Sequence, residues 1–152
     1  MIKRNWTGST RCSFCDRDET IKHLFFDCPL ARVLWRSVQI AFNITPPSSV
    51  ESLFGTWLVG IESETTARQV RVGACALLWV IWNCRNDLAF NRTTTIHFLQ
   101  VVFRATALIR IWSLLTPTEA KARLVTGSVR WEMVARDIFK RFGWRSCNRI
   151  GD

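Results

Sequence analysis

The chain has no tyrosine, only two histidines and only twelve acidic residues among its 152. No two aspartates are adjacent, so the paired aspartates with which a polymerase holds two metal ions are missing. Serine and cysteine hydrolases need a histidine base, which so few histidines hardly provide. Neither glycine-rich phosphate motif, G-x-x-x-x-G-K-[ST] or G-x-G-x-x-G, occurs. We therefore expect that the chain is not an enzyme and has no small-molecule substrate.

Long apolar runs are also absent. The uncharged apolar stretch at 72–84 has 13 residues, whereas a membrane-spanning helix needs about 20. No apolar run follows the first residues, so no signal peptide is recognised. Cysteines without a secretion signal are typical of a reducing compartment. We expect an intracellular protein that does not bind membranes.

Four potential metal ligands lie close together near the N-terminus, in the pattern C-x2-C-x7-H-x4-C. They are Cys12, Cys15, His23 and Cys28. Three thiols and one imidazole complete the tetrahedral set of a structural zinc site, with no position left for a substrate. This spacing predicts one structural Zn²⁺. The alternatives are unmetallated cysteines that pack as small apolar side chains, or a disulfide.

The neighbours of these ligands favour a metal. Pro29 follows the last cysteine and precedes an apolar-periodic stretch, which predicts a helix over 29–42 with Cys28 at its start. A thiolate is favoured there by the helix dipole. Glu19 lies four residues before His23, where it either accepts the second imidazole N–H or is a solvated loop acid. Apolar cover is expected from Leu24, Phe25 and Phe26.

Helical periodicity continues along the chain, and no stretch has the two-residue period of a strand. Helices are predicted over 29–42, 50–57, 65–90 and 95–115, followed by a short one from 116 and a last one after Gly127-Ser128. Helix 65–90 is apolar on most faces and is expected to be central, with Trp79, like Trp112 of the next helix, in the core. The prediction is a mainly α protein: residues 1–42 form a zinc knuckle with its first helix, and 43–152 a basic helical domain.

Positive charge is concentrated in the second half of the chain. The net charge is +9, and residues 77–152 hold 12 basic against 5 acidic side chains. Such an excess indicates an anionic partner, with RNA or DNA first; the alternative is a solvated basic surface. The knuckle carries Asp16, Asp18 and Glu19, which argues against it as the phosphate contact. The candidate nucleic-acid residues are Arg136, Lys140, Arg141, Trp144, Arg145 and Arg149.

Two blocks of residues resemble a known family. The first is the Cys-His pattern with His23-Leu24-Phe25-Phe26 and Pro29, followed by Trp35; the second is Trp82-x2-Arg85-Asn86-x3-Phe90-Asn91. Together they resemble the zinc-binding domain at the C-terminal end of plant LINE-type (non-LTR) retrotransposon reverse transcriptases. The resemblance implies that Cys12, Cys15, His23 and Cys28 are the zinc ligands. In the second block, offsets of 0, 3, 4 and 8 share one helix side, so Arg85 and Asn86 either bind carbonyls of a neighbouring turn or contact nucleic acid.

The resemblance also implies an accessory role beside a polymerase in reverse transcription, and nuclear residence. The leading hypothesis is a zinc-stabilised module that associates with RNA or DNA without sequence preference. The alternative is a protein-interaction module in which the knuckle and helices dock on the upstream reverse transcriptase domain or on another protein.

Overall fold

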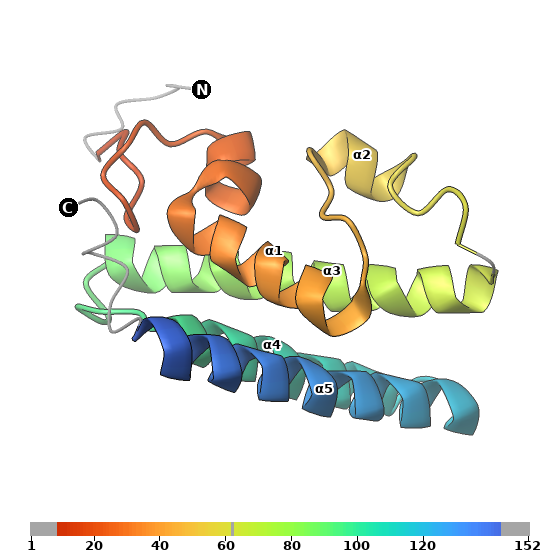
Figure 1. Cartoon of the computed structure of the whole chain (residues 1–152). Coiled ribbons are helices and arrows are strands. Elements are labelled where there is room, and N and C mark those ends of the chain that lie inside the picture. Colours follow the sequence, from red (N-terminus) through yellow and green to blue (C-terminus); the bar gives the residue numbers. More distant parts are fainter. Residues whose placement is uncertain (1–8, 62, 144–152) are drawn as a thin grey trace.

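Helices make up almost all of the regular structure in the computed structural model, which describes residues 9–61 and 63–143 (Figure 1). Within these residues the only strand-like pairing is a single antiparallel bridge between Arg11 and Asp18. The elements in chain order are the π-helix η1 (His23–Asp27), α1 (Pro29–Phe42), α2 (Val50–Phe54), α3 (Glu64–Ala89), α4 (Phe98–Ser113) and α5 (Thr118–Phe142). This architecture confirms the predicted fold class, a zinc knuckle followed by helices.

Three long helices form the body of the molecule. Helix α4 packs between α3 and α5, and α1 crosses over α5 and touches α4 (Figure 1). The knuckle lies over the C-terminal end of α3, where η1 contacts that helix. One continuous buried cluster runs from Cys12 and Phe14 in the knuckle through α1 to Ile138 of α5. The knuckle is therefore built onto the helical core and is no detached appendage.

Local sequence signals set several helix ends. The helix predicted over 29–42 is confirmed, with Pro29 in its first turn and Asn43 as a left-handed C-cap at φ 53°. Two serines cap the next helices. The Ser49 hydroxyl accepts the backbone N–H of Ser52 at the start of α2, and the Ser63 hydroxyl accepts that of Thr66 at the start of α3. Helix α4 begins at Phe98, three residues later than predicted, with His97 as N-cap.

Helix α5 differs from the prediction of two separate helices. It runs without a break through Gly127-Ser128, and the Ser128 hydroxyl donates to the Leu124 carbonyl 2.9 Å away. The apolar stripe of the last helix extends back to Leu124, since residues 124, 128, 131, 135 and 138 are all buried. Burial of this stripe against α1 and α4 outweighs the weak helix propensity of one glycine.

Helix α3 is less buried than its composition suggests. Its inner face packs Leu77, Ile81 and Cys84 into the core, but Trp79 is 55% exposed and Trp82 42% exposed. The prediction that Trp79 lies in the core is therefore wrong; Trp112 is half-buried. Helix α4 and η1 pack against α3, but the side of α3 that carries Trp79 and Trp82 remains open to solvent among the residues described.

Candidate metal centre

A tight turn presents the first two cysteines. The backbone N–H of Cys12 donates to the Arg17 carbonyl at 2.7 Å, and that of Asp16 donates to the Cys12 carbonyl at 3.0 Å. Asp16 closes the turn in the left-handed region at φ 59°, a conformation that aspartate tolerates better than most residues. With only two residues between them, Cys12 and Cys15 thus point to the same side.

The other two ligands come from one short return element. His23 begins η1, and the N–H of Cys28 reaches back five residues to its carbonyl at 2.7 Å. Cys28 is also the N-cap of α1, as the sequence predicts. The wide π-turn places His23 and Cys28 at its two ends; π-turns of this kind are frequent at functional sites.

The four side chains converge on one point. Their ligand atoms all lie within 4.8 Å of one another. Cys12 Sγ is 3.9 Å from Cys28 Sγ, and Cys15 Sγ is 3.1 Å from His23 Nε2. In a tetrahedral site with Zn–S bonds of about 2.3 Å, two sulfurs stand about 3.8 Å apart. The donor set and its spacing therefore fit a single Zn²⁺.

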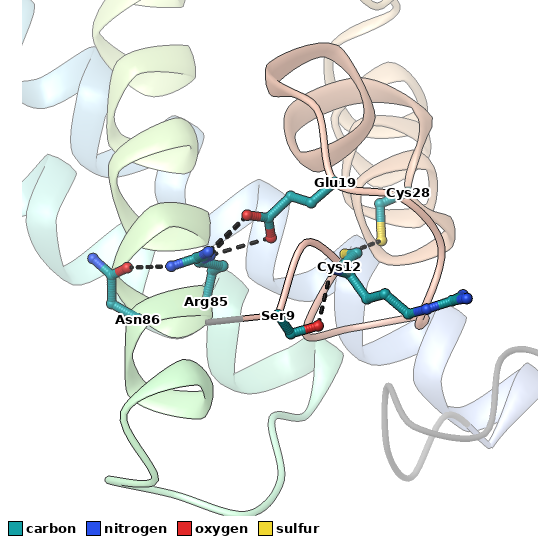
Figure 2. A network of polar contacts seen from close by, with 7 residues as sticks. Ser9, Cys12, Glu19, Cys28, Arg85 and Asn86 are labelled. Atoms are coloured by element: carbon teal, nitrogen blue, oxygen red, sulfur yellow. Dashed lines mark hydrogen bonds and ion pairs between the residues drawn. The ribbon is translucent and has the colours of Figure 1, made fainter. Parts of the chain in front are cut away.

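The other two interpretations of the cysteines fit less well. A disulfide requires sulfurs about 2.05 Å apart, far less than the 3.9 Å between Cys12 and Cys28 (Figure 2). The cysteines of the described part of the chain are all free. Plain apolar packing does not account for an imidazole nitrogen aimed at the same point as three thiols. Zinc is the group that this arrangement suits.

The electrostatics of the cluster also favour a cation. A hydrogen bond from Cys28 lowers the pKa of Cys12 to about 5, against the opposing effect of burial. That shared hydrogen bond, with burial, raises the pKa of Cys28, and burial raises the pKa of Cys15. Three crowded sulfurs thus resist holding three negative charges by themselves. A divalent ion removes this conflict, because it favours the thiolate form of every ligand.

Glu19 does not have either of the roles considered for it from the sequence. Its carboxylate accepts from Arg85 of α3, with Nη2 to Oε1 at 2.7 Å and Nε to each oxygen at 3.1 Å (Figure 2). The side chains are only 16% and 13% exposed. Arg85 also donates to Asn86 Oδ1 at 3.2 Å and lies over the ring of Trp82. Arg85 therefore binds the knuckle rather than the carbonyls of a neighbouring turn.

Apolar side chains close the far side of the centre. Phe14, Leu24 and Phe26 are almost fully buried, while Phe25 is half-buried. Phe26 stacks on Trp35 of α1 at a centroid distance of 6.0 Å, and the Trp35 indole donates to the Phe25 carbonyl at 2.8 Å. This cover excludes water from the sulfurs and joins η1 to the first helix.

Only half of the predicted nucleic-acid residues lie in the described part of the chain. Arg136, Lys140 and Arg141 are exposed on α5, whereas Trp144, Arg145 and Arg149 lie outside the described residues. At 100° per residue, Arg136 and Lys140 share a face, and Arg141 projects from a different one. Arg141 pairs with Asp137 at 3.1 Å, and Arg136 lies over the Phe103 ring. The side-chain hydrogen bonds between the zinc ligands involve none of these three residues.

The fold and the Cys-His cluster together define a zinc-binding accessory domain. Residues 1–35 match a protein family described as zinc-binding in reverse transcriptase. That span contains Cys12, Cys15, His23 and Cys28, which make up a site for one zinc ion. Comparison with curated proteins gives no match, and comparison with solved structures gives none. No helix among the described residues is both long and apolar enough to traverse a bilayer.

The Glu19–Arg85 contact was missed by the sequence analysis, although both residues were noted. The two residues lie 66 positions apart, and no local pattern connects them. The signal available was that Arg85 and Asn86 are polar residues on a helix with several apolar faces. Such a group in a half-buried position requires a partner.

Proposed function

We propose that this chain serves as an accessory module of a retrotransposon reverse transcriptase of the plant LINE type, working in the nucleus. In this proposal zinc shapes the knuckle and takes no part in chemistry, because all four coordination positions are filled by protein side chains. The helical body holds RNA or DNA close to an upstream polymerase domain, without sequence preference. The match of residues 1–35 to a family described as zinc-binding in reverse transcriptase supports a place beside such an enzyme.

Unpaired positive charge on α5 is the observation that carries the nucleic-acid role. Five basic side chains of this helix are exposed and make no ion pair within the described residues: Lys121, Arg123, Arg130, Arg136 and Lys140. Outside α5, six of the ten arginines in the described residues lie in ion pairs, including Arg68, Arg85 and Arg110. Cations without a protein partner are free to replace the counterions of a phosphate backbone.

The knuckle itself is unsuited to phosphate. Asp16 and Asp18 are exposed on its turn, and the half-buried Asp27 closes η1. Arg11, Arg17 and Lys22, whose ammonium pairs with Asp27 at 3.9 Å, only balance these three carboxylates, so the knuckle presents no excess of positive charge. We therefore place nucleic acid on the helices, with Trp79 and Trp82 of α3 as exposed rings on which unpaired bases stack.

A docking role on another protein is the second candidate, and it too has an observation in its favour. Large apolar side chains are exposed where α4 ends, namely Ile111, Leu114 and Leu115, at 61%, 66% and 88%. Exposed apolar groups that lie together are typical of protein interfaces. These three side chains are uncharged, so they would bind a partner through apolar contacts and not through the phosphate contacts proposed for the α5 cations.

Salt dependence distinguishes the two roles. The zinc-loaded chain is titrated with fluorescent single-stranded RNA, single-stranded DNA and duplex DNA at several salt concentrations between about 50 and 200 mM. If phosphate contacts dominate, affinity falls about 10³-fold or more over this range when six or more phosphates are bound. Absence of binding at 50 mM would overturn the nucleic-acid role and favour docking on a protein.

A further inference from the structure

A cavity of about 210 Å³ lies inside the helical body, remote from the zinc ligands. It is bounded by α1, α3, α4, α5 and the segment around Trp57. The wall is almost wholly apolar, and its largest members are Trp35, Phe42, Trp57, Leu77, Ile109 and Trp131. Trp35, Leu77 and Trp131 are buried, whereas Thr66 and Arg123 are exposed, so the cavity opens towards the latter pair.

Two glycines in helix interiors keep this space open. Gly73 of α3 and Gly127 of α5 both line the cavity, and glycine is much less favourable than alanine inside a helix. Neither position requires glycine. A Cβ at Gly73 would lie 3.8 Å from Ile109 Cδ1, and one at Gly127 would lie 3.5 Å from the Phe42 ring. Both are ordinary contacts, so alanine fits at either position, and a longer side chain there would extend from a residue that lines the cavity.

Two polar groups at the wall have no partner within the described residues. The amide nitrogen Nε2 of Gln69 is buried without a hydrogen bond, although buried donors are nearly always satisfied. Arg123 makes no ion pair in the part of the chain described. Both residues line the cavity, Gln69 from α3 and Arg123 from α5, but the Gln69 nitrogen is closed off from a water-sized probe, so the exposed Arg123 is the donor available to a ligand. A guanidinium at the mouth of an apolar chamber is complementary to an oxyanion that carries an apolar body.

We propose that this cavity binds a small amphipathic carboxylate, whose alkyl chain or single aromatic ring fills the chamber. Its carboxylate pairs with Arg123 at the mouth of the cavity. The size is suitable, because an apolar cavity of about 150 Å³ binds benzene, and 210 Å³ admits a ring with a short chain. The binding is non-catalytic, and of the five unpaired α5 cations that support nucleic-acid association it uses Arg123 alone.

Binding is measured on the zinc-loaded full chain by calorimetry and by tryptophan fluorescence, since three tryptophans line the wall. The probes are octanoate and 4-phenylbutyrate, each compared with its neutral alcohol. We expect saturable one-to-one binding of at least one acid, weaker binding of its alcohol, and a rise in melting temperature with ligand. Preference for octanoate would indicate a fatty acid as the natural ligand, and preference for phenylbutyrate an aromatic acid.

Variants locate the binding. Gly73→Leu fills the chamber and should abolish binding, while Gly73→Ala controls for the change in helix propensity. Arg123→Ala changes an exposed side chain and does not threaten folding. It should lower the affinity for the acid about 10-fold or more and the affinity for its alcohol little. Arg130→Ala is the matched control, because Arg130 is an exposed, unpaired arginine two turns further along α5 that does not line the cavity.

Two results would overturn the proposal. The first is a folded, zinc-loaded chain that binds neither acid up to the solubility of the probe. The second is binding that both Gly73→Leu and Arg123→Ala leave unchanged, which would place the acids elsewhere on the surface.

Discussion

Arg85 of α3 holds the Glu19 carboxylate of the knuckle through both of its oxygens, across 66 positions of sequence. The closest contact is 2.7 Å, and both side chains are more than four-fifths buried. A forked, partly buried pair of this kind is stronger and more specific in geometry than a surface ion pair. It fixes the metal centre onto the helical body at the end of α3.

Removal of Arg85 should destabilise the protein by about 2 to 3 kcal/mol, because Arg85→Ala leaves a largely buried carboxylate without its cation. The Glu19→Gln, Arg85→Ala double variant should recover part of this loss. Urea unfolding of the zinc-loaded proteins measures the four corners of the cycle. Arg68→Ala is the matched control, since its pair with Glu64 is exposed at 77% and 67% and should change stability by less than about 0.5 kcal/mol. Equal effects of Arg85→Ala and Arg68→Ala would contradict the assigned role of Arg85.

Zinc removal should loosen the knuckle and α1 while the long helices persist. The Trp35 indole depends on the knuckle for its hydrogen bond to the Phe25 carbonyl and for its stacking on Phe26. A strong chelator, or Cys12→Ser with Cys28→Ser, should therefore change near-ultraviolet dichroism and tryptophan emission. The far-ultraviolet helical signal should fall only modestly. Cys75→Ser is the control, because Cys75 lies in α3 outside the ligand cluster and should retain one zinc per chain.

The bounds of α1, the starts of α2 and α3 and the metal ligands were predictable within a residue because they depend on local rules. Proline after Cys28, serine before α2 and the spacing of the Cys-His pattern each act within a few residues. The partner of Glu19, the exposure of Trp79 and the continuity of α5 were not predictable in this way. They depend on which helix face meets which neighbour, and a helix apolar on several faces does not reveal which of them remains uncovered.

The partners of Glu132 in α5, Arg110 and Thr106 of α4, likewise depend on which helix faces meet. Their effect on the pKa of Glu132 can be tested by the pH dependence of stability. Burial would raise its pKa, but hydrogen bonds from Arg110, at 2.8 Å, and from Thr106 outweigh burial and lower it. A carboxylate whose pKa is lowered by folding stabilises the folded state above its unfolded pKa, and that contribution disappears as pH falls through the folded value.

Glu132→Gln should therefore cost about 1 to 2 kcal/mol at pH 7. The difference from the wild type should shrink as pH falls below about 4.3, the usual value for glutamate. Chemical unfolding across pH 7 to 3 checks this, with both proteins measured after chelation so that loss of zinc does not contribute. A difference that stays constant down to pH 3 would show that the ion pair is not its source. Glu119→Gln, at an exposed position without an ion pair among the described residues, is the control.

Neutralising two cations of α5 should reduce the salt dependence of nucleic-acid binding. Arg136 and Lys140 lie one turn apart on the same face, so Arg136→Gln with Lys140→Gln removes up to two phosphate contacts. The slope of log affinity against log salt should fall by up to about 1.8 for duplex DNA. Arg68→Gln with Arg71→Gln is the matched control, since both arginines already pair with Glu64. Equal slopes in all three proteins would place the phosphate contacts away from this face.

The exposed tryptophans on α3 should contribute to the affinity for single-stranded nucleic acid and not to the affinity for duplexes. Trp79 and Trp82 are one turn apart and both open to solvent, and Arg85 lies 5.6 Å from the Trp82 ring centre. Base–aromatic stacking contributes about 1 to 3 kcal/mol per base. Trp79→Ala should therefore lower the affinity for single-stranded RNA or DNA by about 5-fold or more. Its salt slope and its duplex affinity should not change, because no phosphate contact is lost. Trp79→Phe retains a ring and should recover most of the affinity.

Two outcomes would contradict stacking. If Trp79→Ala lowers the affinity for duplex and for single-stranded nucleic acid alike, the ring stabilises the structure of this surface rather than stacking on bases. If it affects neither but converts an oligomer to a monomer in light scattering, α3 presents a protein interface.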